Sequence, residues 1–167
     1  GQDGKKLDRY WRLAGEVGGS YIAFYMDEHS AARQIIRLAL EEDIGTGDLT
    51  ALAVPPEVRA RARLIAKEAC VLSGLELAPI VLEVFGGDGS VHLAPRIENG
   101  ASVKNGDLVL ELEGRARDLL TTERTLLNLL QRLSGVATQA RLYKDALGDS
   151  AVTILDTRKT TPGLRLF

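Results

Sequence analysis

The stretch AVTILDTRKTTPGLRLF, residues 151–167, decides how the rest of the chain is interpreted. Its residues 152–155 are β-branched or apolar, and a run of this length and type is typical of a buried parallel strand. A polar cluster follows over 156–161. Pro162 and Gly163 then disfavour continued strand pairing. The pattern predicts a strand that ends at about Leu155 and runs out into a polar loop.

The predicted loop carries two adjacent cations and three hydroxyl groups. In α/β folds, ligands bind at the carboxyl ends of the strands. A guanidinium such as that of Arg158 binds carboxylate or phosphate bidentately, whereas the ammonium of Lys159 acts as a point charge. We therefore predict a site for a multiply charged anion. An exposed basic turn without a ligand is the alternative.

Two helices are expected before this strand. Leucines recur at helical spacing from Ala116 to Leu133, which predicts a long helix with a wide apolar stripe. Ser134-Gly135 interrupts the pattern, so a second helix is expected over 136–147. An α/β barrel can begin with this order of elements: a helix, a short loop, a parallel strand and a loop that binds an anion. Taken alone, Arg124 beside Glu123 indicates only a solvated helix face.

The residues before 116 predict a mixed domain of helices and strands. The alternation in VRARARLIAK, residues 58–67, predicts a strand with three arginines on a solvated face. Glycines at 45 and 47 predict a structural turn over 43–50. The other expected elements are helices at 30–42 and 75–84, strands at 69–73 and 90–94, and a hairpin over 100–113 with its turn at Asn105-Gly106.

The predicted fold class is therefore α/β. An N-terminal α+β sandwich domain is expected over 26–115, and residues 116–167 are expected to form the opening helices and first strand of an incomplete α/β barrel. Residues 1–25 are interpreted as a leader or extension, because Met26 is the sole methionine. The alternative for this segment is an added helix and strand that contact a partner subunit.

Composition and charge exclude several classes of function. A net charge of -2 opposes a nucleic-acid surface, which would need a basic excess. Residues 1–25 lack the uninterrupted apolar core of a signal peptide and the roughly 20 apolar residues of a membrane span. We therefore expect no nucleic acid, no membrane and a cytoplasmic location. The single cysteine, Cys70, excludes an intrachain disulfide and is interpreted as a small buried hydrophobe.

Three segments, in order along the chain, resemble segments of the quinolinate phosphoribosyltransferase family. They are EDIGTGDLT at 42–50, ERTLLNLLQRLSGVAT at 123–138 and DTRKTTPGLR at 156–165. The resemblance extends from about Ala31 to the end of the chain. It implies transfer of a phosphoribosyl group from phosphoribosyl pyrophosphate (PRPP) to quinolinate, with loss of carbon dioxide and release of pyrophosphate. The product would be nicotinate mononucleotide, in NAD biosynthesis.

The resemblance implies roles for four residues. Thr157 and Arg158 match ligand-contacting positions, and Arg158 would clamp a quinolinate carboxylate. Lys159 matches the lysine that faces the donor or pyrophosphate, and it is the candidate catalytic residue. Arg124 matches an arginine that reaches into the active site of the partner subunit, which implies a homodimer or a higher homo-oligomer. Mg²⁺ is implied together with PRPP, with its ligands expected beyond Phe167.

The family's barrel continues well past the residues seen here, and further cations and acidic site residues are expected beyond Phe167. We therefore expect the 167-residue chain to be inactive by itself. Two alternatives stay open. One is a non-catalytic dimerisation or binding fragment, and the other is a related phosphoribosyltransferase that acts on another pyridine carboxylate.

Overall fold

A computed structural model describes residues 16–17, 20–21, 28–86, 89, 91–161 and 164. The first two of these segments are β1 (Glu16–Val17) and β2 (Ser20–Tyr21), which pair antiparallel. The leader or extension predicted for residues 1–25 otherwise lies outside the described residues.

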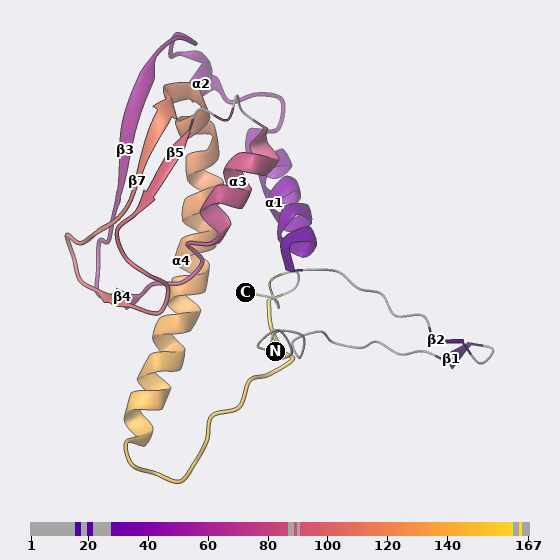
Figure 1. Cartoon of the computed structure of the whole chain (residues 1–167), viewed down its shortest axis with the longest axis vertical. Coiled ribbons are helices and arrows are strands. Elements are labelled where there is room, and N and C mark those ends of the chain that lie inside the picture. The colour runs from indigo at the N-terminus through magenta and orange to yellow at the C-terminus, as the bar shows by residue number, and fades with distance from the viewer. Residues whose placement is uncertain are drawn as a thin grey trace, which may run out of the picture.

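Nine elements follow, and they build two small sheets and a set of helices (Figure 1). The larger sheet has the order β3-β7-β5 with antiparallel pairing, and the smaller one pairs β4 with β6. In chain order the elements are α1 (Glu28–Ile44), α2 (Leu49–Leu52), β3 (Arg59–Ile65), β4 (Cys70–Val71), α3 (Leu77–Phe85), β5 (His92–Pro95), β6 (Ser102–Val103), β7 (Leu108–Arg115) and α4 (Ala116–Leu147).

The larger sheet has one charged face and one apolar face. On β3, Arg61 and Arg63 are exposed, while the alternating residues Ala62 and Leu64 are half-buried against the core, as the sequence predicts. The partner of Leu64 across the strand pair is Leu110 on β7, which is 1% exposed. The sheet therefore buries only its inner face.

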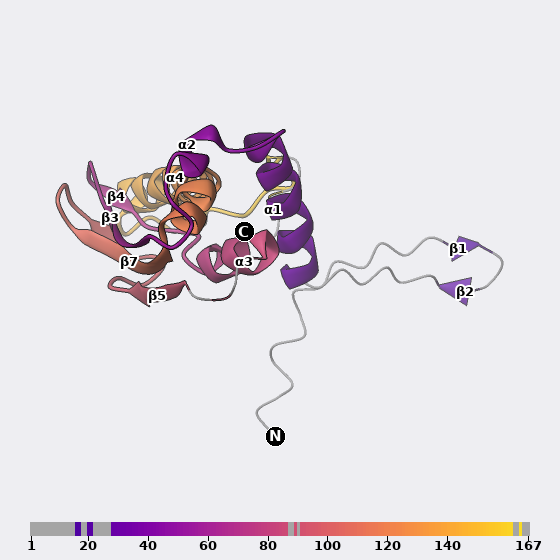
Figure 2. The same ribbon diagram turned by 90° about the horizontal axis from the view of Figure 1, so that it is seen from above.

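Helix α4 covers this inner face, and α3 and α1 pack against α4 and against each other (Figure 2). Residues from all of these layers join one apolar core, whose largest fully buried side chains are Ile36, Leu77, Val81, Val109 and Leu110. This arrangement confirms the predicted N-terminal α+β sandwich. The helices predicted at 30–42 and 75–84 correspond to α1 and α3, and the strands predicted at 58–67, 69–73 and 90–94 correspond to β3, β4 and β5.

The predicted break at Ser134-Gly135 is wrong, because α4 is one continuous helix of 32 residues. A glycine inside a helix costs only about 1 kcal/mol relative to alanine. Leu130 and Leu133, just before it, are 4% and 7% exposed, and burial of one leucine side chain stabilises by about 1.5–3 kcal/mol. Core packing therefore outweighs the local preference for a break.

The predicted hairpin over 100–113 is also wrong, although its turn forms. Asp107 donates its N–H to the Lys104 carbonyl at 3.1 Å, and Gly106 has φ +94°. The flanking strands then diverge, since β6 pairs with β4 whereas β7 pairs with β3 and β5. The turn itself docks on Ala66, whose carbonyl accepts the Gly106 N–H and whose N–H donates to the Asp107 carbonyl, both at 2.9 Å.

The strand predicted at 152–155 does not form. Residues 151–161 carry no regular secondary structure, and Ile154 and Leu155 are 50% and 82% exposed. A strand requires a neighbour that accepts and donates its ladder hydrogen bonds. In the described part of the chain, no strand lies beside 152–155.

Candidate functional site

The connection between α1 and α2 faces Arg124 on α4. The Nε atom of Arg124 donates a hydrogen bond to Asp43 Oδ2 at 3.1 Å and lies 3.0 Å from Asp43 Oδ1. Its Nη2 atom lies 3.6 Å from Asp48 Oδ2. The hydrogen bond to Asp43, and then the negative charges of Asp43 and Asp48, raise the pKa of Arg124 above its ordinary value. Arg124 is therefore a cation that is paired with two carboxylates.

Local sequence explains how these carboxylates are placed. α1 ends at Ile44, and Gly45 and Gly47 follow with φ +51° and +142°, angles that favour glycine. Asp48 then caps α2, because its Oδ1 accepts the N–H groups of Thr50 at 2.9 Å and Ala51 at 3.2 Å. The turn predicted over 43–50 is thus confirmed.

The candidate anion-binding residues lie on the segment that follows α4. Thr157, Arg158 and Lys159 are all exposed. Thr157 donates its N–H to Asp156 Oδ1 at 2.7 Å, and its Oγ1 accepts the Lys159 N–H at 3.2 Å. These local bonds form a compact polar turn that presents the two cations.

The same segment returns to the middle of α4. Arg132 donates from Nη2 to Thr161 Oγ1 at 2.8 Å. Arg124 precedes Arg132 by eight residues, which corresponds to about 12 Å along a helix axis. Arg124 makes no hydrogen bond or ion pair with Thr157 or Lys159 within the described residues. The structure therefore groups residues 157–159 on one turn and Arg124 with Asp43, and the roles of all four residues stay predictions.

Sequence reasoning missed the partners of these residues. The sequence pattern predicts only a turn for Asp43 and Asp48, and it does not predict the contact between Arg132 and Thr161. Asp43 and Arg124 are 81 positions apart, so no local pattern joins them. The available signal is that Asp43 and Arg124 both lie in segments that resemble one family.

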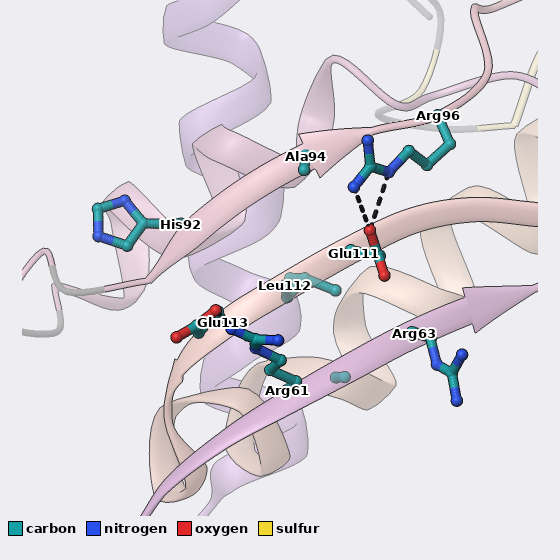
Figure 3. A pocket seen from close by; sticks show the side chains of 9 residues that line it. Arg61, Arg63, His92, Ala94, Arg96, Glu111, Leu112 and Glu113 are labelled. Atoms are coloured by element: carbon teal, nitrogen blue, oxygen red, sulfur yellow. Dashed lines mark hydrogen bonds and ion pairs between the residues drawn. The ribbon is translucent and has the colours of Figure 1, made fainter.

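A shallow depression of about 560 Å³ lies on the outer face of the larger sheet (Figure 3). Arg61 and Glu113 form an ion pair at 2.8 Å across it, and Arg96 is paired with Glu111. Figure 3 shows Arg63 extending away from these pairs. The acidic side chains thus pair with two of the three arginines on this solvated face. None of the four candidate residues lines this depression.

A groove of about 890 Å³ contains Cys70 among residues of β3, β4 and α4. Cys70 is partly buried and packs against the apolar core. Burial, and then the negative charge of Glu68, raise the pKa of the Cys70 thiol above its ordinary value. The thiol therefore stays protonated at neutral pH, which favours a packing role over a nucleophilic one.

The described residues contain no group of three or more His, Cys, Asp or Glu side chains arranged to hold a metal ion. Asp43 and Asp48 are engaged by Arg124 and by the backbone of α2, so this pair does not fit a magnesium site. Among the helices that the structure describes, none is both long and apolar enough to cross a membrane.

Comparison with known proteins finds two adjoining family domains along the chain. The quinolinate phosphoribosyl transferase N-terminal domain matches residues 48–134, and the C-terminal domain of the same family matches residues 136–167. The two matches meet inside α4. The boundary predicted between 115 and 116 stays a prediction.

Individual relatives agree with the domain matches. The nicotinate-nucleotide pyrophosphorylase [carboxylating] of Mycobacterium leprae is 43% identical over 141 residues, which cover 83% of this chain and 49% of the relative. The probable enzyme of the same name from Bacillus subtilis is 40% identical over 83% of this chain and 47% of its own length. The chain spans about half the length of the curated relatives that it matches.

The fold of the chain is also similar to solved structures of this family. The structure of the nicotinate-nucleotide pyrophosphorylase from Francisella tularensis superposes with a TM-score of 0.78 at 33% identity, over 84% of this chain and 50% of the other. This similarity confirms the predicted fold class. Since the N-terminal family domain alone matches more than half of the chain, the chain belongs to the quinolinate phosphoribosyl transferase family.

Proposed function

We propose that this chain is part of an enzyme that transfers the phosphoribosyl group of PRPP to quinolinate, releasing pyrophosphate and carbon dioxide and giving nicotinate mononucleotide. The observation that carries the proposal is the exposed turn at 157–159. It carries a guanidinium and an ammonium on adjacent, exposed residues within the part of the chain that the C-terminal family domain matches. A cytoplasmic location belongs to the same proposal.

The substrates explain why such a site has to be basic. Quinolinate carries two adjacent carboxylates, PRPP carries several negative charges, and the ribose carbon becomes cationic as pyrophosphate leaves. Catalysis then consists largely of holding mutually repelling anions in line and stabilising the charge of the leaving group. Arg158 would clamp a quinolinate carboxylate bidentately, Thr157 would donate from its hydroxyl, and Lys159 would face the donor or the pyrophosphate.

Arg124 is proposed to serve the active site of a second subunit. Beside it, α2 exposes Leu49 and Leu52 to 82% and 60%, an apolar surface of the kind that a subunit interface covers. In a two-fold dimer the same surface occurs on both chains, so each site would receive one arginine from its partner. The occupant of this surface is proposed to be a second copy of the same protein.

Mg²⁺ is proposed to enter as a complex with PRPP, where it would neutralise phosphate charge. The described carboxylates do not fit a magnesium site, so no step is assigned to side chains that would hold the ion. What the described residues supply is anion binding by Arg158 and Lys159.

The test is production of nicotinate mononucleotide by the product of the whole reading frame that encodes this chain. The purified protein would be incubated with PRPP, Mg²⁺ and quinolinate, and product and carbon dioxide would be quantified. Product from quinolinate and none from nicotinate supports the proposal. Transfer to nicotinate or to another pyridine carboxylate in preference to quinolinate contradicts the substrate assignment.

The 167-residue chain would be assayed in parallel. We expect no product from it, because Thr157, Arg158 and Lys159 lie on an exposed turn rather than in an enclosed site. Clear production of nicotinate mononucleotide by this homogeneous chain would show that expectation to be wrong.

A further inference from the structure

Arg124 is not oriented by its own helix, because the groups that hold it come from the connection between α1 and α2. The Nε–H bond to Asp43 Oδ2, at 3.1 Å, crosses 81 positions of sequence. Asp48 approaches the same edge of the guanidinium at its Nη2 atom, which lies 3.6 Å from Asp48 Oδ2. The two carboxylates thus meet one edge of the guanidinium.

This geometry leaves the opposite edge available. In the described part of the chain, no hydrogen bond engages Nη1 of Arg124, and 51% of the side chain is exposed. A guanidinium presents five N–H donors in a rigid fork, so fixing the Nε side also fixes the direction of the remaining donors. Arg124 can therefore be held by Asp43 and still bind an anion.

Asp48 is itself rigidly placed. Its side chain is 5% exposed, and its Oδ1 accepts two backbone N–H groups at the start of α2. The remaining oxygen, Oδ2, consequently points in a fixed direction towards Arg124. Asp43, at 24% exposure in the last turn of α1, makes the direct hydrogen bond. The segment EDIGTGDLT, residues 42–50, thus places two carboxylates beside Arg124.

Two carboxylates beside one guanidinium carry a net negative charge, which by itself opposes the approach of an anionic substrate. The arrangement is useful only if orientation outweighs this repulsion. An unrestrained arginine loses rotamer entropy when it is fixed. Holding the guanidinium before the substrate arrives removes part of that cost from binding, the usual benefit of preorganisation.

We propose that Asp43 is a positioning residue, supported by Asp48, that aims the Nη donors of Arg124 at an anionic group of the substrate in the partner subunit's site. This inference rests on the proposed function. Asp43 does not contact the substrate itself and acts only through Arg124.

The test is a double-mutant cycle in the product of the whole reading frame, made with Asp43→Ala, Arg124→Ala and the double variant. kcat/KM would be measured with quinolinate and with PRPP. We expect Asp43→Ala to lower kcat/KM about tenfold, and to change it less than twofold once Arg124 is alanine, because two residues that act through one contact are not additive. Asp43→Asn, which keeps an oxygen acceptor for the Nε–H, should recover most of the activity.

A matched control is the pair of Arg33 on α1 and Glu83 on α3, another surface arginine–carboxylate contact at 2.9 Å. Glu83→Ala removes an ion pair whose arginine is exposed to a similar extent, 40% against 51% for Arg124, although Glu83 is more exposed than Asp43. This variant should leave kcat/KM unchanged. Tm would be recorded for every variant. A purely structural role of Asp43 would lower Tm and would persist in the Arg124→Ala background.

The outcomes separate the two proposals. Non-additive losses with recovery by Asp43→Asn support the positioning role. Additive losses in an active enzyme overturn it and leave the proposed function intact. A wild-type protein that makes no product from quinolinate and PRPP overturns the proposed function, and the positioning role falls with it.

Discussion

Ser134 on α4 and Ser73, which follows β4, are joined through a single hydroxyl group. Ser134 Oγ accepts the Ser73 N–H at 3.0 Å and donates to the Ser73 carbonyl at 3.3 Å. One turn later, Thr138 Oγ1 accepts the N–H of Val71 at 2.9 Å. These bonds fasten α4 to the edge of the smaller sheet, and they lie where the sequence predicts that the helix ends.

Replacement of Ser134 by alanine should lower the free energy of unfolding by about 1–2 kcal/mol. The N–H of the partly buried Ser73 would lose its acceptor, and an unsatisfied donor costs about 1–3 kcal/mol, less the small gain in helix propensity that alanine brings. Urea denaturation would measure the change. Ser102→Ala, at an exposed position of β6, is the control and should have an effect within 0.5 kcal/mol of zero, about the range of surface substitutions.

Gly135→Ala should raise the free energy of unfolding by about 0.5–1 kcal/mol, since Gly135 lies inside α4 and a Cβ atom there would meet nothing within 4 Å. Thermal and urea unfolding would both show the increase. A loss of stability would mean that the helix needs a bend at this position, as the sequence pattern suggested.

Gly74→Ala is the contrasting variant. Gly74 has φ +96°, and a Cβ atom at this position would lie 2.6 Å from Leu133 Cδ1. Backbone strain and overpacking should together destabilise the protein by about 1–3 kcal/mol. Opposite signs for Gly135→Ala in α4 and Gly74→Ala between β4 and α3 would show that backbone conformation and local packing at each position decide the effect of adding a Cβ atom.

The parts of the fold that could be predicted are those whose signal is local. Arg61 and Arg63 alternate with small and apolar residues because one face of β3 meets water and the other meets α4. This alternation is visible in the sequence and predicts the strand. The continuity of α4 through Gly135 could not be predicted, because it depends on leucines that pack against strands and helices distant in sequence. The absence of a strand at 152–155 could not be predicted either, because a strand needs a neighbouring strand, and residues 152–155 do not show whether one is present.

The candidate site also contains features that could be predicted from the sequence and features that could not. The cations of residues 157–159 are visible in the sequence because they are adjacent. The pairing of Arg124 with Asp43 is not, because it is created by the packing of α4 beside the end of α1. The resemblance to a family identified Arg124 but gave no sign of the carboxylates that hold it.

Arg158→Lys should weaken substrate or transition-state binding by about 2–5 kcal/mol in the product of the whole reading frame, because an ammonium cannot replace a bidentate guanidinium. Steady-state kinetics with quinolinate and PRPP would measure the loss as a fall in kcat/KM. Tm should hardly change, since Arg158 is exposed and lies outside the core.

Arg96→Lys is the control for this prediction. Arg96 is an exposed arginine paired with Glu111 on the outer face of the larger sheet, remote in sequence from the candidate residues. The substitution should leave kcat/KM unchanged. Equal kinetics for Arg158→Lys and the wild type would instead identify the turn at 157–159 as a solvated surface without a ligand.

Mixing two inactive variants provides the most direct test of whether active sites are shared between subunits. Arg124→Ala and Arg158→Ala would be prepared separately in the product of the whole reading frame and combined under conditions in which subunits exchange. Each homodimer should be nearly inactive, because every site in it lacks one of the two arginines. In a mixed dimer, the subunit that keeps Arg158 would receive Arg124 of the partner subunit, and that site would be complete.

A statistical mixture contains about one half mixed dimers, and each has one complete site of two, so activity should reappear up to about one quarter of the wild-type value. Native mass spectrometry would confirm that exchange has occurred. If Arg124 instead serves the site of its own chain, every site in the mixed dimer still lacks one arginine, and no activity returns. Recovery therefore distinguishes an arginine that crosses the interface from one that belongs to its own subunit's site or to a solvated helix face.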